Sequence, residues 1–228
     1  MKSEGSSEWI GVSDMMTGLM MVFLFVSILF MQQVQAEKES IEQLAVTYED
    51  YRTKLYLALA DEFDQDLEDW NAEILDDSTV RFNEPNVLFD AGSSLIKSRF
   101  AEILNDFFPR YVKVLASDDF KEHIEEVRIE GHTSSTWPGS RGLEERYLKN
   151  ALLSQQRSFA ILEYCFALGS IVQHQDWLTG VIRANGLAFA SPILIRGVED
   201  RARSRRVEFK VKTKAEERIH EIIQTINQ

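Results

Sequence analysis

The chain has 228 residues, of which 44% are hydrophobic and 27% charged, and its formal net charge is −12. This composition excludes a wholly disordered chain and a chain embedded entirely in the membrane. The negative charge argues against a nucleic-acid partner, because neutralising phosphates requires clustered Lys and Arg, and the basic run at 201–206 is short and local. The single cysteine, Cys165, cannot form an intrachain disulfide.

Residues 10–31 form the longest apolar stretch, and only one of them, Asp14, is charged. A helix of that length spans about 33 Å, enough to cross the hydrocarbon core of a bilayer. We therefore predict a short leader at 1–9 and a single transmembrane helix at 10–33. A cleaved signal peptide would have a more positive leader and a shorter apolar core. The sequence at 34–36 resembles a cleavage site, so that alternative stays open.

Asp14 is the informative residue of this span. A carboxylate costs about 2.5–3.5 kcal/mol at the centre of a membrane-spanning helix. Thr17 and Gly18 follow Asp14 by one helical turn, so one helix face is small and polar. Small residues let helices approach closely, which predicts that this face contacts other helices. Asp14, with Thr17 beside it, is then an ion-binding group on an ion path; the alternative is an interfacial residue favoured by the helix dipole.

Residues 34–76 are predicted to form a helical linker. The stretch 37–75 is rich in charged residues, Gln and Leu, and contains neither Gly nor Pro. Its apolar positions recur at spacings of three and four, as in a coiled-coil heptad: Ile41, Leu44, Tyr48, Tyr51, Leu55 and Ala58. We expect a parallel homodimeric stalk. The alternative is a helix that packs on its own globular domain.

From about residue 77 the predicted strands and helices alternate. Strands are expected at 79–82, 86–89, 124–129, 182–185 and 206–211, and helices at 97–115, 144–168, 174–181 and 214–228. The order βαβαβ predicts a two-layer sandwich of helices on a sheet. The expected fold class is therefore α+β, with a transmembrane helix and a helical linker before a domain at 77–228.

Four motifs of this domain resemble those of OmpA-like peptidoglycan-binding domains in order and spacing. They are VLFDAGSSL at 87–95, GHT at 131–133, NALLSQQR at 150–157 and SRRVE at 204–208. The third matches the family's Asn-x-x-Leu-Ser-x-x-Arg signature, and the resemblance covers about residues 80–212. It implies binding of the peptide stem of peptidoglycan. Arg157 would pair with a carboxylate of diaminopimelate, with Asn150 beside it and Leu153 supporting the pocket.

The sequence departs from this family at Ser134. Members usually have an Asp at this position, which holds the amine of the ligand. A neutral hydroxyl cannot replace that charge, so the affinity and the ligand itself are open here.

Enzyme signatures are missing: the four histidines lack metal-ligand spacing, and no phosphate-binding loop is present. We therefore expect neither an enzyme nor a bound cofactor.

A helix with one acidic residue, a helical linker and an OmpA-like domain together resemble the MotB family of stator subunits. The segment WIGVSDMMTGLM at 9–20 is similar to that family's Trp…Asp-x-Met-Thr signature. With its short leader, it is closer to the ZorB branch, from Zorya anti-phage systems, than to flagellar MotB.

The resemblance implies a homodimer within a MotA-like (ZorA-like) ring in the bacterial inner membrane. The N-terminus would be cytoplasmic, and the C-terminal domain would bind peptidoglycan in the periplasm. Asp14 would take up the transported ion, H⁺ first and Na⁺ as the alternative. A flagellar-type stator subunit and a passive tether without ion transport remain alternative functions.

Overall fold

The computed structural model describes residues 4–83 and 88–214. For residues 4–11, 40, 44, 45 and 47 it describes the backbone only. The chain divides into two units, residues 1–47 and residues 48–228. The helix expected at 214–228 lies outside the described residues beyond Lys214.

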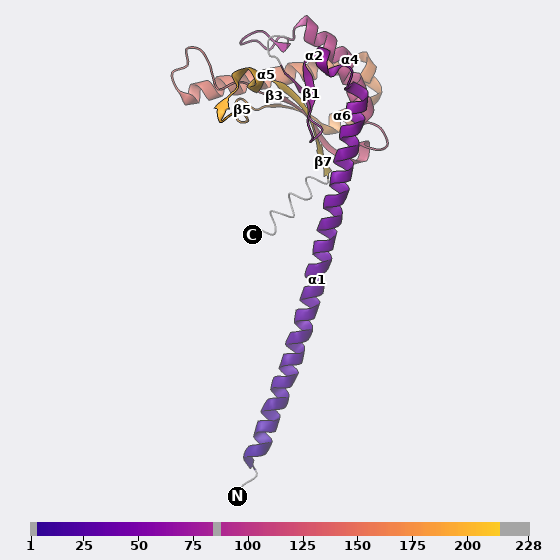
Figure 1. Ribbon diagram of the computed structural model, residues 1–228, viewed down its shortest axis with the longest axis vertical. Helices are drawn as coiled ribbons and strands as arrows, with labels where there is room; N and C mark the ends of the chain where they lie inside the picture. The colour runs from indigo at the N-terminus through magenta and orange to yellow at the C-terminus, as the bar shows by residue number, and fades with distance from the viewer. Residues whose placement is uncertain (1–3, 84–87, 215–228) are drawn as a thin grey trace. The chain divides into compact units, whose positions relative to one another are not determined.

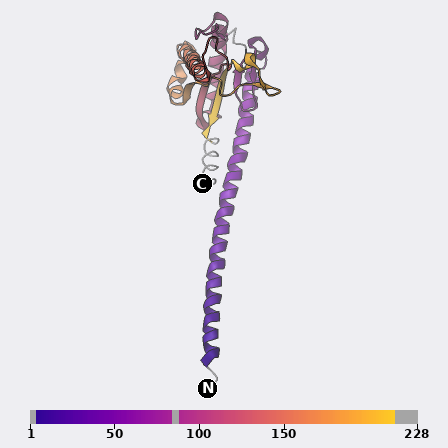
Figure 2. The same cartoon turned by 90° about the vertical axis from the view of Figure 1, so that its left-hand side faces the viewer.

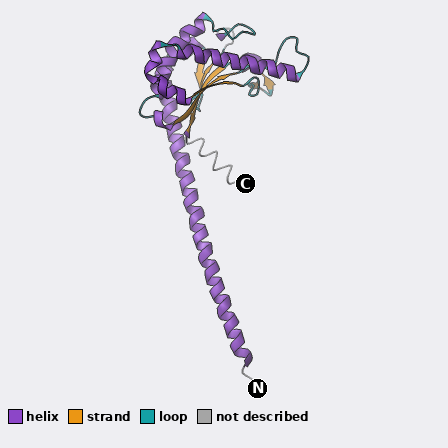
Figure 3. Ribbon diagram, turned by 180° about the vertical axis from the view of Figure 1, so that it is seen from behind, coloured by secondary structure: helices purple, strands orange, loops and turns teal. Residues whose placement is uncertain are grey.

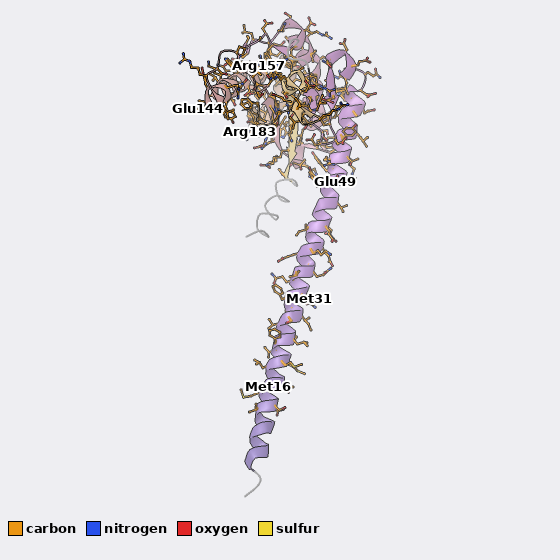
Figure 4. The ribbon with its side chains drawn as sticks, turned by 60° about the vertical axis from the view of Figure 1, so that its left-hand side comes forward. Met16, Met31, Glu49, Glu144, Arg157 and Arg183 are labelled. Atoms are coloured by element: carbon orange, nitrogen blue, oxygen red, sulfur yellow. The ribbon has the colours of Figure 1, made fainter. Side chains whose placement is uncertain are left out.

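Helix α1, Glu4–Phe63, contains the predicted membrane span (Figure 1, Figure 2). It is the one helix of the described residues that is long and apolar enough to cross a membrane, and none of its apolar window is buried. Met16 and Met31 are 67% and 70% exposed, and Figure 4 shows both side chains standing out from the helix. A continuous apolar surface of this kind requires lipid or other helices around it.

Helix α1 ends at Phe63, so the prediction of a helix reaching residue 75 is wrong for its last part. A short helix α2, Leu67–Trp70, and a strand β1, Ala72–Ile74, follow it. Strand β1 pairs antiparallel with β2, Val80–Phe82. The composition of this stretch favours helix, but cross-strand pairing outweighs that local preference. The sheet consequently begins at Ala72, before the expected boundary at residue 77.

The second half of the predicted coiled-coil seam packs inside its own unit. Leu55 of the seam is buried in the hydrophobic core, and Tyr51 and Ala58 pack against that core. Leu59 and Phe63, which follow the seam, are also buried there. The Tyr51 hydroxyl donates a hydrogen bond of 3.0 Å to the carbonyl of Phe120. From Tyr51 onward the expected homodimeric seam is therefore wrong, and packing on the chain's own domain is correct. The apolar period of a helix is the same for both kinds of partner, so spacing could not distinguish them.

This packing predicts a large difference between two leucines of α1. Leu59→Ala is expected to destabilise the second unit by about 2–5 kcal/mol, because it leaves a cavity in the core. Leu57→Ala, at a position that is 58% exposed, is the matched control and is expected to change stability by less than about 0.5 kcal/mol. Thermal unfolding of the full chain in detergent, followed by near-UV circular dichroism, measures both. Equal midpoints for the two variants would contradict the burial of this segment.

Five strands form one sheet in the order β1-β2-β7-β3-β4. Strands β3 (Ile124–Gly131) and β4 (Ile182–Gly186) are parallel, whereas β7 (Val207–Thr213) is antiparallel to both β2 and β3. The two long helices are α4, Ser98–Leu115, and α5, Leu143–Phe166. Figure 3 shows α5 crossing the strands. The sequence β2-α4-β3-α5-β4 confirms the expected βαβαβ order in two layers.

Shorter elements complete the second unit: η1 (Lys121–His123), η2 (Gly169–His174), α6 (Gln175–Val181), the β5–β6 hairpin (Leu194–Ile195 with Val198–Glu199) and α7 (Arg201–Ser204). The strand expected at 86–89 is described only from residue 88, where Phe89 forms one isolated bridge with Ile96. Cys165 is buried and free, as its apolar surroundings predict.

The core lies between the sheet and its helices and is mostly aromatic. The ring of Phe107 in α4 lies 5.0 Å from the rings of Phe82 and Phe209, which come from β2 and β7. Phe63 of α1 lies 5.2 Å from the same ring. One phenylalanine therefore joins α1, α4 and two strands, which fixes the helical layer against the sheet.

Candidate binding pocket at the end of strand β3

Two paired glycines bring helix α5 unusually close to the sheet. Gly131 and Gly186 are register partners at the ends of β3 and β4. A Cβ atom on Gly131 would lie 2.5 Å from the carbonyl oxygen of Ser154, and one on Gly186 would lie 2.3 Å from the amide nitrogen of Gln155. Only glycine fits at such distances. The close approach places the middle of α5 directly over the end of β3.

Side chains of α5 tie this approach to the strand ends. The Ser154 hydroxyl accepts a hydrogen bond of 3.0 Å from the backbone N–H of Ala188. The amide of Gln155 donates to the carbonyl of Ala184 and accepts from the N–H of Gly186. The next turns of the same helix carry Asn150 and Arg157, so their positions relative to β3 are fixed.

A cavity of about 520 Å³ lies at this place. Asn150, Leu153, Arg157 and Ser134, the four residues predicted for ligand binding, all line it. The other lining residues come from the loops after residue 88 and after β3 and from the link between α7 and β7: Phe89, Ala91, Gly92, Thr133, Thr136, Trp137, Pro138 and Arg205. The structure thus brings the predicted residues together in one hollow.

Arg157, labelled in Figure 4, lines the cavity. It is only 6% exposed. Its Nε donates to the carbonyl of Ser93 at 2.8 Å, and one terminal nitrogen, Nη2, donates to the carbonyl of Asp90 at 3.0 Å. The guanidinium carbon lies 4.8 Å from the centre of the Phe89 ring. Among the described residues nothing accepts a hydrogen bond from the other terminal nitrogen, Nη1, which leaves that donor for a ligand.

The charge of Arg157 has no counterion within the described parts of the chain. Burial, and secondarily the nearby charge of Arg205, lowers the pKa of the Arg157 guanidinium to about 10. The group therefore stays protonated at neutral pH. An uncompensated buried cation is unfavourable because its charge has lost hydration. A bound carboxylate would offset that desolvation cost and the electrostatic repulsion between Arg157 and Arg205.

The remaining predicted residues shape the cavity. The Asn150 amide donates to the carbonyl of Arg146 at 2.9 Å and to that of Thr136 at 3.4 Å, which joins α5 to the loop after β3. Leu153 is 8% exposed and supplies an apolar wall. Ser134 is 4% exposed, and its hydroxyl lies 3.0 Å from that of Thr136. None of the three adds a charge.

A second polar cluster occupies the opposite face of the sheet. Four charged residues, three acidic and one basic, occupy paired positions across four strands: Glu73, Arg81, Glu208 and Glu130. One oxygen of Glu208 accepts from Nε of Arg81 at 2.7 Å and from Nε of Arg206 at 2.6 Å. Burial acts to raise the pKa of the Glu208 carboxyl, but His132 and Arg206 hold it well below its usual range.

In the same cluster, Glu130, His132 and Glu208 present possible metal ligands within 4.8 Å of one another. His132 Nε2 lies 3.4 Å from Glu208 and 3.7 Å from Glu130. The two arginines already neutralise Glu208, however, and a cation bound there would be repelled by both. We assign this cluster to the stability of the sheet.

In the first unit, Asp14 and Thr17 both lie on exposed surface of α1. The Thr17 hydroxyl donates to the carbonyl of Ser13 at 2.8 Å, so its hydrogen atom serves the helix backbone. Its oxygen remains able to accept a hydrogen bond from a protonated carboxyl or to bind a cation.

Among the lining residues that sequence reasoning missed, Arg205, Phe89 and Trp137 have the largest side chains. Arg205 belongs to the basic run at 201–206. Its position beside the cavity depends on the pairing of β7 with β3, which the run itself does not indicate. Strand alternation could have found it, because Arg206 and Glu208 share one face and Arg205 must then point to the helical face. Phe89 and Trp137 lie in loops, where no period exists to predict a side-chain direction.

The chain was compared with known proteins. The Zorya protein ZorB of Escherichia coli is 50% identical to it over 226 residues, which are 98% of this chain and 95% of that protein. No protein-family model matches the chain.

Solved structures give more distant likenesses. A putative MotB-like protein from Desulfovibrio vulgaris is 20% identical with a TM-score of 0.46, over 72% of this chain and 96% of that one. The cell wall anchor of the type VI secretion system (T6SS) of Pseudomonas aeruginosa is 21% identical with a TM-score of 0.44, over 68% and 97%. The periplasmic domain of Helicobacter pylori MotB is 17% identical with a TM-score of 0.42, over 64% and 84%.

Proposed function

The chain belongs to the family of the Zorya protein ZorB, and on that premise we propose that it is the peptidoglycan-anchored stator subunit of an ion-driven motor used in anti-phage defence. In this proposal α1 crosses the bacterial inner membrane once, with its N-terminus in the cytoplasm. The second unit lies in the periplasm and binds the cell wall. The role is mechanical and involves no enzymatic reaction.

One observation carries the wall-binding part: the buried Arg157 guanidinium has an open Nη1 donor and no carboxylate partner in the described chain. Peptide stems of peptidoglycan carry free carboxylates. An arginine whose other nitrogens are fixed by backbone carbonyls is already oriented, so little rotamer freedom is lost on binding.

The motor part of the proposal depends on Asp14. The proposed assembly is a homodimer whose two α1 helices lie within a ring of MotA-like (ZorA-like) subunits. Neutralising and recharging Asp14 would change its contacts with the ring, and the proton or sodium motive force supplies about 2.3 kcal/mol per charge per 100 mV. The wall-bound units would hold the dimer while the ring turns.

Binding to purified sacculi tests the anchoring role. The full chain in detergent is expected to sediment with sacculi, and Arg157→Gln is expected to lose at least about tenfold in affinity because the charge-assisted bond to the carboxylate is removed. Arg183→Gln is the matched control: it removes an arginine on β4 that lies outside the cavity lining. Retention of the Arg157 variant at the level of the control would refute wall binding through this cavity.

A further inference from the structure

Among the described residues, the charged side chains that line the cavity are all positive: Arg157 and the half-buried Arg205 line it, and no Asp or Glu of the described chain does. Glu199 is outside the lining, and its carboxylate accepts hydrogen bonds from both the N–H and the hydroxyl of Ser135. Asp90 contributes its carbonyl to Arg157, while its side chain is 76% exposed and pairs with Lys97.

Several neutral groups that could hold a cation already contact the protein's own cations or donors. A cation could rest on an aromatic face, but Arg157 already lies over Phe89, and Nζ of Lys149 lies 5.9 Å from the centre of the Trp137 ring. The carbonyls of Ser93 and Asp90 are used by Arg157.

The carbonyl of Thr136 accepts from Asn150, and the Ser134 and Thr136 hydroxyls face each other. The other side-chain oxygens of the described lining, the amide oxygen of Asn150 and the hydroxyl of Thr133, are uncharged. Among the described lining residues an ammonium group would therefore meet two guanidinium groups and no carboxylate. A carboxylate would meet two donors that lack a partner in the described chain.

We infer that this cavity selects a carboxylate whose neighbouring nitrogen is uncharged, that is, an N-acylated amino dicarboxylate. Such a group occurs where the side-chain amine of a stem peptide is joined by an amide bond to a second peptide. The inference rests on the proposed wall-binding function and specifies its ligand: the acylated, cross-linked form in preference to the free amine.

Two small dicarboxylates with the same carbon skeleton test this preference: diaminopimelate and its N,N′-diacetyl derivative. They differ in whether the nitrogens are charged. Calorimetry with the full chain in detergent is expected to give at least about tenfold tighter binding of the diacetyl form. Pimelate, which has no nitrogen, controls for contacts of the acetyl groups and is also expected to bind more tightly than diaminopimelate. Equal affinities, a preference for diaminopimelate, or no measurable binding of the diacetyl form would overturn the inference.

Ser134→Asp tests the cause of the preference. It places a carboxylate in the lining, and it is expected to reverse the order so that diaminopimelate binds more tightly than its diacetyl form. Thr136→Asp supplies the same charge at an exposed lining position if the buried Ser134 variant folds poorly. Gln156→Glu, on exposed surface of α5 outside the lining, is the charge control and should keep the wild-type order. An unchanged order in both aspartate variants would also overturn the inference.

Sacculus binding separates this inference from the function on which it rests. If the full chain sediments with sacculi through Arg157 but prefers diaminopimelate, the anchoring role stands and the ligand preference is wrong. If the chain does not sediment with sacculi at all, the anchoring role fails.

Discussion

Asp14→Asn is expected to abolish phage protection in cells that carry the complete defence system, returning the efficiency of plating to that of cells without it. Asparagine has nearly the shape of aspartate but cannot take up and release a proton, and it binds a cation much more weakly. The step that couples the ion gradient to motion is then lost. The effect should be complete, because the described span contains no second ionisable residue between Val12 and Met31.

The same experiment must separate lost activity from lost assembly. Removing a charge from a membrane span makes insertion easier, so the variant should reach the membrane in normal amounts and copurify with the ring subunit. Ser27→Ala is the matched control, since the Ser27 hydroxyl serves only the carbonyl of Phe23 one turn earlier in the described chain. Full protection by Asp14→Asn would favour a passive tether.

Gly186→Ala is expected to destabilise the second unit by about 3 kcal/mol and to impair wall binding at the same time. Its new Cβ would meet backbone atoms of Gln155 at 2.3 and 2.5 Å, and backbone cannot move aside as a flexible side chain does. Helix α5 must shift away from the sheet, and Arg157 moves with it. For a unit of this size, such a loss lowers the unfolding midpoint by roughly 6–12 °C.

The matched control is Gly180→Ala in α6, where an added Cβ would meet nothing within 4 Å. Alanine is favoured over glycine in helices, so this variant should be neutral or slightly stabilising. Thermal unfolding of the full chain in detergent and sedimentation with sacculi measure the two effects. A Gly186 variant with an unchanged midpoint would mean that α5 is not held against β4 by this contact.

The elements that sequence predicted well have strong internal periods. Helix α5 and strand β3 were found nearly to the residue, because apolar side chains repeat along them at the helical or strand spacing. The choice of Asn150, Leu153 and Arg157 came from the resemblance to the Asn-x-x-Leu-Ser-x-x-Arg signature, and the helical period placed them on one helix. Their pairing with Ser134 required the resemblance to a family, since nothing local relates α5 to the loop after β3.

The elements that sequence mispredicted depend on contacts between distant residues. Strand β1 is three residues long, and only its pairing with β2 makes it a strand. The charged row Glu73–Arg81–Glu208 shows the same limit. Charged side chains in a strand predict exposed positions, yet Glu208 is only 6% exposed, and it is paired with Arg81 of β2 and with Arg206 just before β7.

The burial of Leu55, Leu59 and Phe63 bears on how this chain can be recombined with others. The module that carries the cavity does not begin where the sheet begins, because the last turns of α1 are part of its interior. A fusion point near residue 77 between two related chains would remove these three side chains from the hydrophobic core of the unit that carries the cavity. The apolar side chains that they cover would then be exposed to water and prone to aggregate. Exchange between related chains is therefore expected to preserve the fold only upstream of Tyr48, so that the end of α1 and the unit that carries the cavity stay together.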